Sequence, residues 1–300
     1  MTRTPTIENH LTVSAPDGTS IAYAVAGKGP ALVLTNGLTT TSFFWKYLRP
    51  QWLRRHTVVT WDFPGHGGSA AARSDRSASI EGQPAILARV MDAAGVQHAT
   101  QIGWSVGCQV VLEMYRQLPA RCDALVTLFG PAEHALSNTA LPVPGAWIDA
   151  VLAQPRGAEL ARVIQRVVQA ATLPGAAPLL RGLGLIGEGT STADLRQLIT
   201  ELGRVDAATG QRMARSAEAH SAHAVLAGLR VPLLIMAGDK DPFAPPRRVG
   251  VPMHRAAPGS ELVRLPRATH TALLDHADQI GAVVDDFLRR RVKPLRVQSN

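Results

Sequence analysis

A serine between two glycines is the feature of this sequence best suited to covalent chemistry. Ser105 is the centre of residues 103–107, which read GWSVG; it follows a run typical of a strand, 99–102, and precedes a segment typical of a helix, 108–115. A Gly-x-Ser-x-Gly pentapeptide at a strand-to-helix turn predicts a nucleophile elbow, in which a strained backbone lifts the serine hydroxyl above the sheet. Small residues also form ordinary tight turns, but the strand before and the helix after favour a nucleophile.

A serine hydroxyl is inert without a base, and the base needs an acid that orients it. Proteins with this elbow carry the three groups in the order Ser, Asp or Glu, His along the chain. Downstream of the serine, one strand-like run ends just before Asp239 and Asp241, and the next one ends shortly before His270. Three reactive groups at three strand ends predict one catalytic site, with His270 as the base.

Nearly the whole chain resembles the α/β-hydrolase-fold proteins, of the esterase and cofactor-free haloperoxidase-like kind. Beside the elbow, residues 32–38 (LVLTNGL) are similar to the family's strand and oxyanion loop, and residues 61–69 (WDFPGHGGS) to its Asp-x-x-Gly-His-Gly-x-Ser segment. Gly238 with Asp241 three residues later, followed by Pro245, resembles the family's acid loop. The resemblance therefore implies Asp241 as the acid.

The resemblance also implies an oxyanion hole made of two backbone N–H groups, those of Leu38 and Val106. This chain has Asn36 where the family often has a histidine before the glycine, which raises a question about hydrogen bonding in that loop and about the substrate class. Trp104, next to the serine, is expected to contact the substrate.

Two other carboxylates compete for the role of the acid. Asp239 directly follows Gly238, a position that suits a hydrogen bond within its own loop. Glu133 lies just past the strand-like run 124–129, where some members of the fold place their acid. The complete acid-loop motif favours Asp241 over both.

Strands and helices alternate along most of the chain, which predicts a doubly wound, mostly parallel α/β sheet of about eight strands flanked by helices. Residues 11–13 and 21–26 predict an antiparallel start around a turn. The later predicted strands are 31–36, 57–62, 99–104, 124–129, 233–237 and 262–265, and the clearest helices are 80–94 and 272–291.

The alternation breaks between residues 132 and 227, which we interpret as a helical cap inserted into the core domain formed by residues 1–131 and 228–300. One face of a helix is predicted there, because large apolar residues recur at helical spacing. They are Leu160, Val163, Ile164, Val167 and Val168.

Composition limits the classes of partner. The 300 residues are 46% hydrophobic, enough for a sizeable core, and carry a net charge of +8. The basic excess is scattered arginine, and its one cluster, Arg289–Arg291 with Lys293 and Arg296, suits the dipole at a helix end. No aromatic residues interleave with that cluster to stack bases, so we expect no nucleic-acid partner.

No apolar run approaches the ~20 residues of a membrane-spanning helix, so no membrane insertion is expected. The first ten residues hold no apolar stretch for export. Only Cys108 and Cys122 occur, which argues against a disulfide framework and favours a cytoplasmic location. The oligomeric state is not predicted.

Two motifs suggest bound groups but lack the context these need. Glycines 182, 184 and 187 match a dinucleotide fingerprint, yet they neither follow a strand nor begin a βαβ unit, so a turn in the cap is expected. His220 and His223 could pair on one face of a cap helix, but the sequence shows no convergent carboxylate or cysteine for a metal site. We expect no cofactor and no metal.

Three further polar residues near these motifs are expected to have structural roles. His66 lies in the glycine-rich segment that resembles a phosphate loop but lacks its Lys-Ser/Thr pair, and is expected to brace the turn. Asp275 and His276 fall inside the last predicted helix and are expected to face solvent or a neighbouring helix.

The sequence therefore predicts a serine hydrolase, specifically a carboxylesterase, that cleaves an ester-type bond of a small to medium apolar substrate through an acyl-enzyme. A lactonase, a C–C bond hydrolase or a perhydrolase could use the same residues. A protein of another class also fits, one that senses a ligand or binds a partner and turns over slowly, because fold and function are separable.

Overall fold

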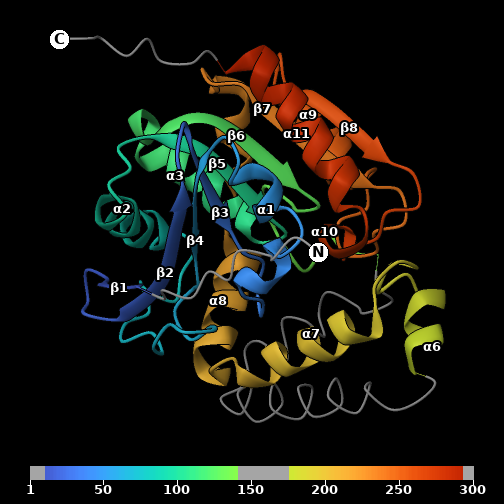
Figure 1. Ribbon diagram of the computed structural model, residues 1–300, viewed down its shortest axis with the longest axis horizontal. Coiled ribbons are helices and arrows are strands. Elements are labelled where there is room, and N and C mark those ends of the chain that lie inside the picture. Colours follow the sequence, from blue (N-terminus) through green and yellow to red (C-terminus); the bar gives the residue numbers. More distant parts are fainter. Residues whose placement is uncertain (1–10, 141–175, 293–300) are drawn as a thin grey trace.

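Eight strands form one sheet. The structure, a computed structural model, describes residues 11–140 and 176–292 (Figure 1). The strands are β1 (Leu11–Ser14), β2 (Ser20–Gly27), β3 (Ala31–Thr35), β4 (Thr57–Trp61), β5 (Ala99–Trp104), β6 (Cys122–Leu128), β7 (Leu233–Gly238) and β8 (Glu261–Leu265). Their order is β1-β2-β4-β3-β5-β6-β7-β8, and only β2 runs against its neighbours. The predicted mostly parallel sheet is confirmed.

Helices cover both faces of the sheet, so strands in its middle are buried on both sides. Every residue of β5 and of β7 is buried. The residues of β7 form a continuous apolar run, as expected for a strand that is covered on both faces. The helices are η1 (Ser42–Trp45), α1 (Arg49–Trp52), α2 (Gln83–Ala93), α3 (Gly107–Gln117), η2 (Pro119–Arg121), α6 (Ala176–Gly182), α7 (Thr192–Arg204), α8 (Ala207–Ala219), η3 (His223–Gly228), α9 (Gly250–Ala256), α10 (Ala272–Asp275) and α11 (Ala277–Arg291).

Two apolar cores follow from this arrangement, one on each face of the sheet. Side chains of α2, α3 and α9, such as Leu87, Val110 and Met253, belong to the first core. Side chains of η1, α1 and α11, such as Trp45, Trp52 and Phe287, belong to the second. The doubly wound prediction is confirmed by these two layers.

The order of the strands reverses its direction between β3 and β5, in the middle of the sheet. After β3 the chain moves outward to β4, and after β5 it moves outward in the opposite direction to β6. Loops that leave the carboxyl ends of two such neighbouring strands diverge, and open α/β sheets bind their ligands in the crevice between them. Asn36 follows β3 and Ser105 follows β5, so both lie at this point.

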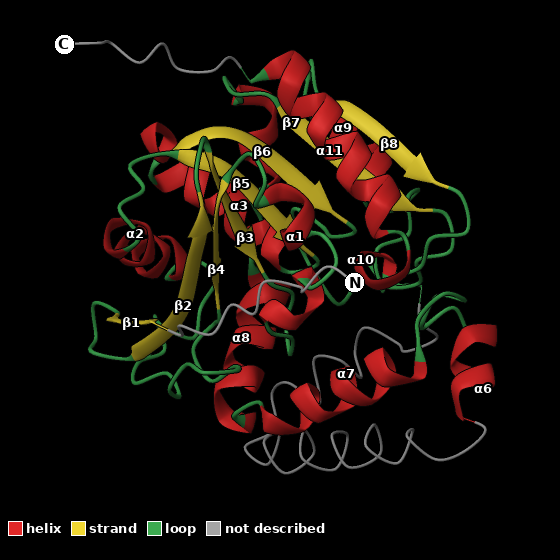
Figure 2. Cartoon of the chain, viewed as in Figure 1, coloured by secondary structure: helices red, strands yellow, loops and turns green. Residues whose placement is uncertain are grey.

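Between β6 and β7 the described elements are the helices α6, α7, α8 and η3. In Figure 2, α6, α7 and α8 form a group of their own beside the sheet. The helix predicted from the spacing of residues 160–168 lies outside the described residues, and the division into a core and a cap domain stays a prediction. Among the described residues, no helix has the length and apolarity needed to cross a membrane.

One predicted helix is interrupted in the structure. Residues 272–291 form α10 and α11, which meet at His276, where φ is −123° and ψ is 23°. The side chain of Asp275 is completely buried, with one oxygen 3.0 Å from Nδ1 of His276. The expectation that Asp275 faces solvent or a neighbouring helix is therefore wrong, because a loop between α6 and α7 covers it.

Candidate active site

The turn between β5 and α3 holds Ser105 in a strained backbone conformation. Its φ is 56°, in the left-handed region that residues other than glycine seldom occupy. Its amide donates to the Leu128 carbonyl at 3.0 Å, and its carbonyl accepts from the Cys108 amide at 2.9 Å. A Cβ on Gly103 would lie 2.3 Å from the carbonyl oxygen of Gly107, so the turn needs a glycine there. This is the backbone geometry that the elbow motif predicts.

Three polar side chains meet at the carboxyl edge of the sheet. Nε2 of His270 lies 2.9 Å from Oγ of Ser105, and its Nδ1 lies 2.9 Å from Oδ2 of Asp241. The Asp241 side chain is fully buried, whereas the imidazole is 13% exposed. A histidine that donates from Nδ1 to a carboxylate keeps Nε2 free to accept the serine proton.

The carboxylate of Asp241 is fixed by its own loop. Its Oδ1 accepts from the amides of Phe243 at 2.8 Å and Ala244 at 3.0 Å, which leaves Oδ2 for His270. The side chain therefore has one oxygen held by backbone and one directed at the imidazole.

Neither competing carboxylate is bonded to the imidazole. Asp239 pairs with Arg264, with Oδ1 2.8 Å from Nε, and its side chain is 33% exposed. Glu133 accepts from Oγ of Ser221 at 2.6 Å and lies 3.3 Å from Nδ1 of His223. Asp241 is thus the acid that the geometry favours.

Trp104 supports the histidine. The residue is 3% exposed, and its ring stacks on Phe44 with centroids 4.1 Å apart. Its Nε1 donates to the backbone carbonyl of His270 at 3.2 Å. The contact of Trp104 with the substrate stays a prediction. The sequence did not predict the hydrogen bond from Trp104 to the His270 carbonyl.

The loop after β3 lies against the nucleophile. A Cβ on Gly37 would lie 2.9 Å from Cβ of Ser105, so the loop can come this close only with a glycine. Within the described residues, the amides of Leu38 and Val106 form no backbone hydrogen bond outside regular helices and strands. These are the two amides predicted for the oxyanion hole.

Asn36 braces this loop from within. The residue is 1% exposed, and its Nδ2 donates to the Trp61 carbonyl at 2.8 Å and to Oδ1 of Asp62 at 3.3 Å. Its Oδ1 accepts from Nε1 of Trp45 at 2.7 Å. The asparagine therefore ties β3 to the end of β4 and to η1, which answers the question that its position raised about hydrogen bonding in the loop.

His66 holds the same loop from the other side. It is fully buried; Nε2 accepts from the amide of Thr39 at 3.1 Å, and Nδ1 donates to the Pro64 carbonyl at 2.8 Å. Because one nitrogen accepts, the ring must be neutral, and burial lowers its pKa to about 4. The sequence indicated a brace for the turn, but not the contact with the oxyanion loop.

This burial makes stability depend on pH. The pKa of His66 is about 4 in the folded chain against 6.5 for an ordinary histidine, so the unfolded chain takes up the proton first as the pH falls. The neutral ring makes its full contribution to the free energy of unfolding above about pH 6.5. As the pH falls from about 6.5 to about 4, this contribution is lost, which lowers the free energy of unfolding by about 3 kcal/mol.

Between about pH 7 and pH 4.5, the free energy of unfolding should fall in both proteins. We expect the fall to be about 2 kcal/mol smaller in the His66→Gln variant than in the parent, because the variant has no buried imidazole to protonate. Urea unfolding at the two pH values measures the difference, and the carboxylates common to both proteins cancel. Equal losses in the two proteins would contradict the assignment of a neutral, buried His66.

The predicted histidine pair does not converge on one point. His220 follows the end of α8, with Nε2 3.0 Å from the buried carboxylate of Glu113, and His223 begins η3 and faces Glu133. Hydrogen bonds from His220, Arg116 and Gln117 outweigh burial and hold the pKa of Glu113 at about 2. The described residues contain no group of three potential metal ligands. The two histidines therefore contact separate carboxylates.

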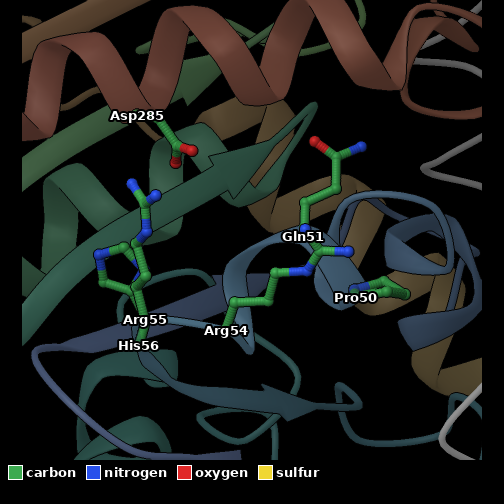
Figure 3. A pocket seen from close by; sticks show the side chains of 6 residues that line it. All are labelled: Pro50, Gln51, Arg54, Arg55, His56 and Asp285. Carbon is green, nitrogen blue, oxygen red and sulfur yellow. The ribbon is translucent and has the colours of Figure 1, made fainter.

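A cavity of about 340 Å³ lies where the chain enters β4, at the opposite end of that strand from the Ser105 site (Figure 3). It shares no residue with that site. It is lined by Pro50, Gln51, Arg54, Arg55, His56 and Asp285.

Comparison with known proteins identifies the fold family. A family model described as alpha/beta hydrolase fold matches residues 30–277. The chain is 27% identical over 282 residues to the pimeloyl-(acyl-carrier protein) methyl ester esterase of Neisseria meningitidis serogroup C, with 92% of this chain and 96% of the relative covered.

Solved structures share the fold. The enol-lactonase of Burkholderia xenovorans LB400 is similar with a TM-score of 0.74 at 20% identity, covering 93% of this chain and 100% of that one. The esterase RhEst1 from Rhodococcus sp. ECU1013 has a TM-score of 0.72 at 20% identity, covering 93% and 98%. Because the family model spans most of the chain and includes Ser105, Asp241 and His270, the chain belongs to the α/β hydrolase fold family and is an enzyme of that fold.

Proposed function

We propose that the chain is a serine hydrolase that cleaves an ester-type bond of a small to medium apolar substrate. The observation that carries this proposal is the unbroken hydrogen-bonded series from Ser105 through His270 to Asp241. A relative named as a methyl ester esterase supports the ester as the bond that is cleaved.

In the proposed reaction, Oγ of Ser105 attacks the acyl carbonyl while Nε2 of His270 takes its proton. Asp241 keeps the imidazole in the tautomer with Nδ1 protonated and stabilises the imidazolium that forms. The proton then passes to the leaving alcohol, which leaves an acyl-enzyme on Ser105. Water, deprotonated by the same histidine, releases the acid.

The negative charge on the former carbonyl oxygen would be held by the amides of Leu38 and Val106. One such donor is worth ~3 kcal/mol of transition-state stabilisation. Asn36, Gly37 and His66 act indirectly in this proposal, because they fix the loop that carries the first of these amides.

The helices between β6 and β7 would form the cap over this site. The contact of their α6–α7 loop with Thr271, next to His270, supports that placement. A cytoplasmic location is supported by two free, buried thiols, Cys108 and Cys122, whose pKa values burial raises.

We expect rapid multiple turnover of p-nitrophenyl acyl esters, with a rate in the range usual for enzymes, above about 1 s⁻¹ for the best chain length. Stopped-flow release of p-nitrophenol over a series of acyl chains measures both the burst and the steady state. A single slow turnover per chain for every ester would contradict the enzyme and support a ligand-sensing protein.

A further inference from the structure

The loop between α6 and α7 contacts the segment that carries His270. The amide of Gly187 donates to Oγ1 of Thr271 at 2.9 Å, and Oγ1 of Thr190 lies 3.2 Å from the same atom. Thr190 is 1% exposed and Thr271 is 5% exposed. Two residues far from His270 in sequence thus hold the residue that directly follows it.

Three threonine hydroxyls form a chain that ends on a carboxylate. Oγ1 of Thr190 donates to Oδ2 of Asp275 at 3.4 Å. A hydroxyl has one proton, so Thr271 must donate to Thr190, and Thr269 to Thr271, each over 3.2 Å. The chain therefore has one direction and passes from one neighbour of His270 to the other.

The loop is shaped to fit this segment. A Cβ on Gly187 would lie 1.6 Å from Oδ2 of Asp275, and a Cβ on Gly189 would lie 2.9 Å from Cβ of Asp275. Only glycines allow the loop to come so close to the buried carboxylate. Gly187, the last glycine of the segment that matches a dinucleotide fingerprint, is thus required by packing.

His270 is consequently held from two directions. Nε1 of Trp104, from the turn that carries Ser105, holds its carbonyl, and the hydroxyl chain holds the residues on either side of it. The bond between Nε2 and Oγ of Ser105 is 2.9 Å long, so a small rotation of this segment would lengthen it beyond use.

We propose that Thr190 is a positioning residue: through Thr271 it holds His270 at hydrogen-bond distance from Ser105, so that docking of the α6–α7 loop completes the active site. This inference rests on the proposed function, because it takes His270 as the base. Displacement of a reacting group by about 1 Å costs up to about 100-fold in rate, so a loosened base should lower kcat.

The test is the Thr190→Val variant, which keeps the shape of the side chain and removes its hydroxyl. With a p-nitrophenyl ester, we expect kcat to fall about tenfold while KM changes less than about twofold. The rate of covalent labelling by a fluorophosphonate should fall in parallel. Thr190→Ser retains the hydroxyl and should recover most of kcat.

Tyr47→Phe is the matched control. The Tyr47 hydroxyl lies 3.0 Å from Asp194 at the start of α7, so this variant removes a second contact between the same helices and the core without touching the hydroxyl chain. We expect an unchanged kcat. Equal losses in Thr190→Val and Tyr47→Phe would show a general loosening of these helices and overturn the proposal.

A wild-type kcat in Thr190→Val, or a Thr190→Ser variant as slow as Thr190→Val, would also overturn it. Ser105→Ala, measured in parallel, separates this inference from the proposed function. If Ser105→Ala is inactive while Thr190→Val is normal, only the positioning role fails. If Ser105→Ala is active, the proposed function fails.

Discussion

Replacement of Ser105 by alanine is expected to abolish labelling by a fluorophosphonate and to lower kcat by at least about 10⁴-fold. The hydroxyl is the only group on this residue that could form the acyl-enzyme, and it lies 2.9 Å from Nε2 of His270, the base that would take its proton. The comparison needs folded protein, which the far-ultraviolet circular dichroism of both proteins checks.

Cys108, three residues along, offers no substitute nucleophile. It is completely buried, its Sγ lies 3.3 Å from the Gly103 carbonyl, and burial raises the pKa of its thiol. Labelling or turnover that survived in Ser105→Ala would therefore move the chemistry to another part of the molecule.

The second large effect concerns the acid, because Asp241→Asn should cost about 10⁴-fold in kcat. The side-chain oxygen of the asparagine can still accept hydrogen bonds from the amides of Phe243 and Ala244. Its NH₂ group would then point at His270. Nδ1 must then accept a hydrogen bond from that NH₂ group, so the proton of the neutral ring lies on Nε2, and Nε2 can no longer take the proton of Ser105.

Asp239→Asn is the matched control in the same loop. Its carboxylate pairs with Arg264 at the surface, an exposed ion pair of the kind that contributes about 1 kcal/mol or less. We expect nearly unchanged kcat. A larger loss in Asp239→Asn than in Asp241→Asn would mean that the wrong carboxylate is assigned, and small losses in both would make Glu133 the candidate.

Much of the architecture could be predicted because its signals are local. The fully buried strand β7 is an unbroken apolar run, and the alternation of strands with helices predicts a mostly parallel sheet. Ser105 directly follows β5, and Asp241 and His270 lie in the loops that follow β7 and β8. Parallel strands bring such loops to one end of the sheet. The sequence therefore predicted that the three would meet.

Interactions between segments distant in sequence were not predictable in the same way. The sequence predicted that His66 braces its own turn. The hydrogen bond that Nε2 of His66 accepts from the Thr39 amide was not predictable, because it depends on how two loops approach each other. The burial of Asp275 was predicted wrongly, because helical periodicity in 272–291 carries no information about a loop from another part of the chain.

By itself, the sequence determined the fold class, the strand ends and the three candidate residues, since each depends on neighbours within a few positions. Only the tertiary structure decided which carboxylate contacts His270 and how Asn36 and His66 hold the oxyanion loop. It also decided that Thr190 contacts Thr271, the residue that follows His270. Hydrogen bonds require atoms within a few tenths of an ångström, and that precision arises only when distant segments pack together.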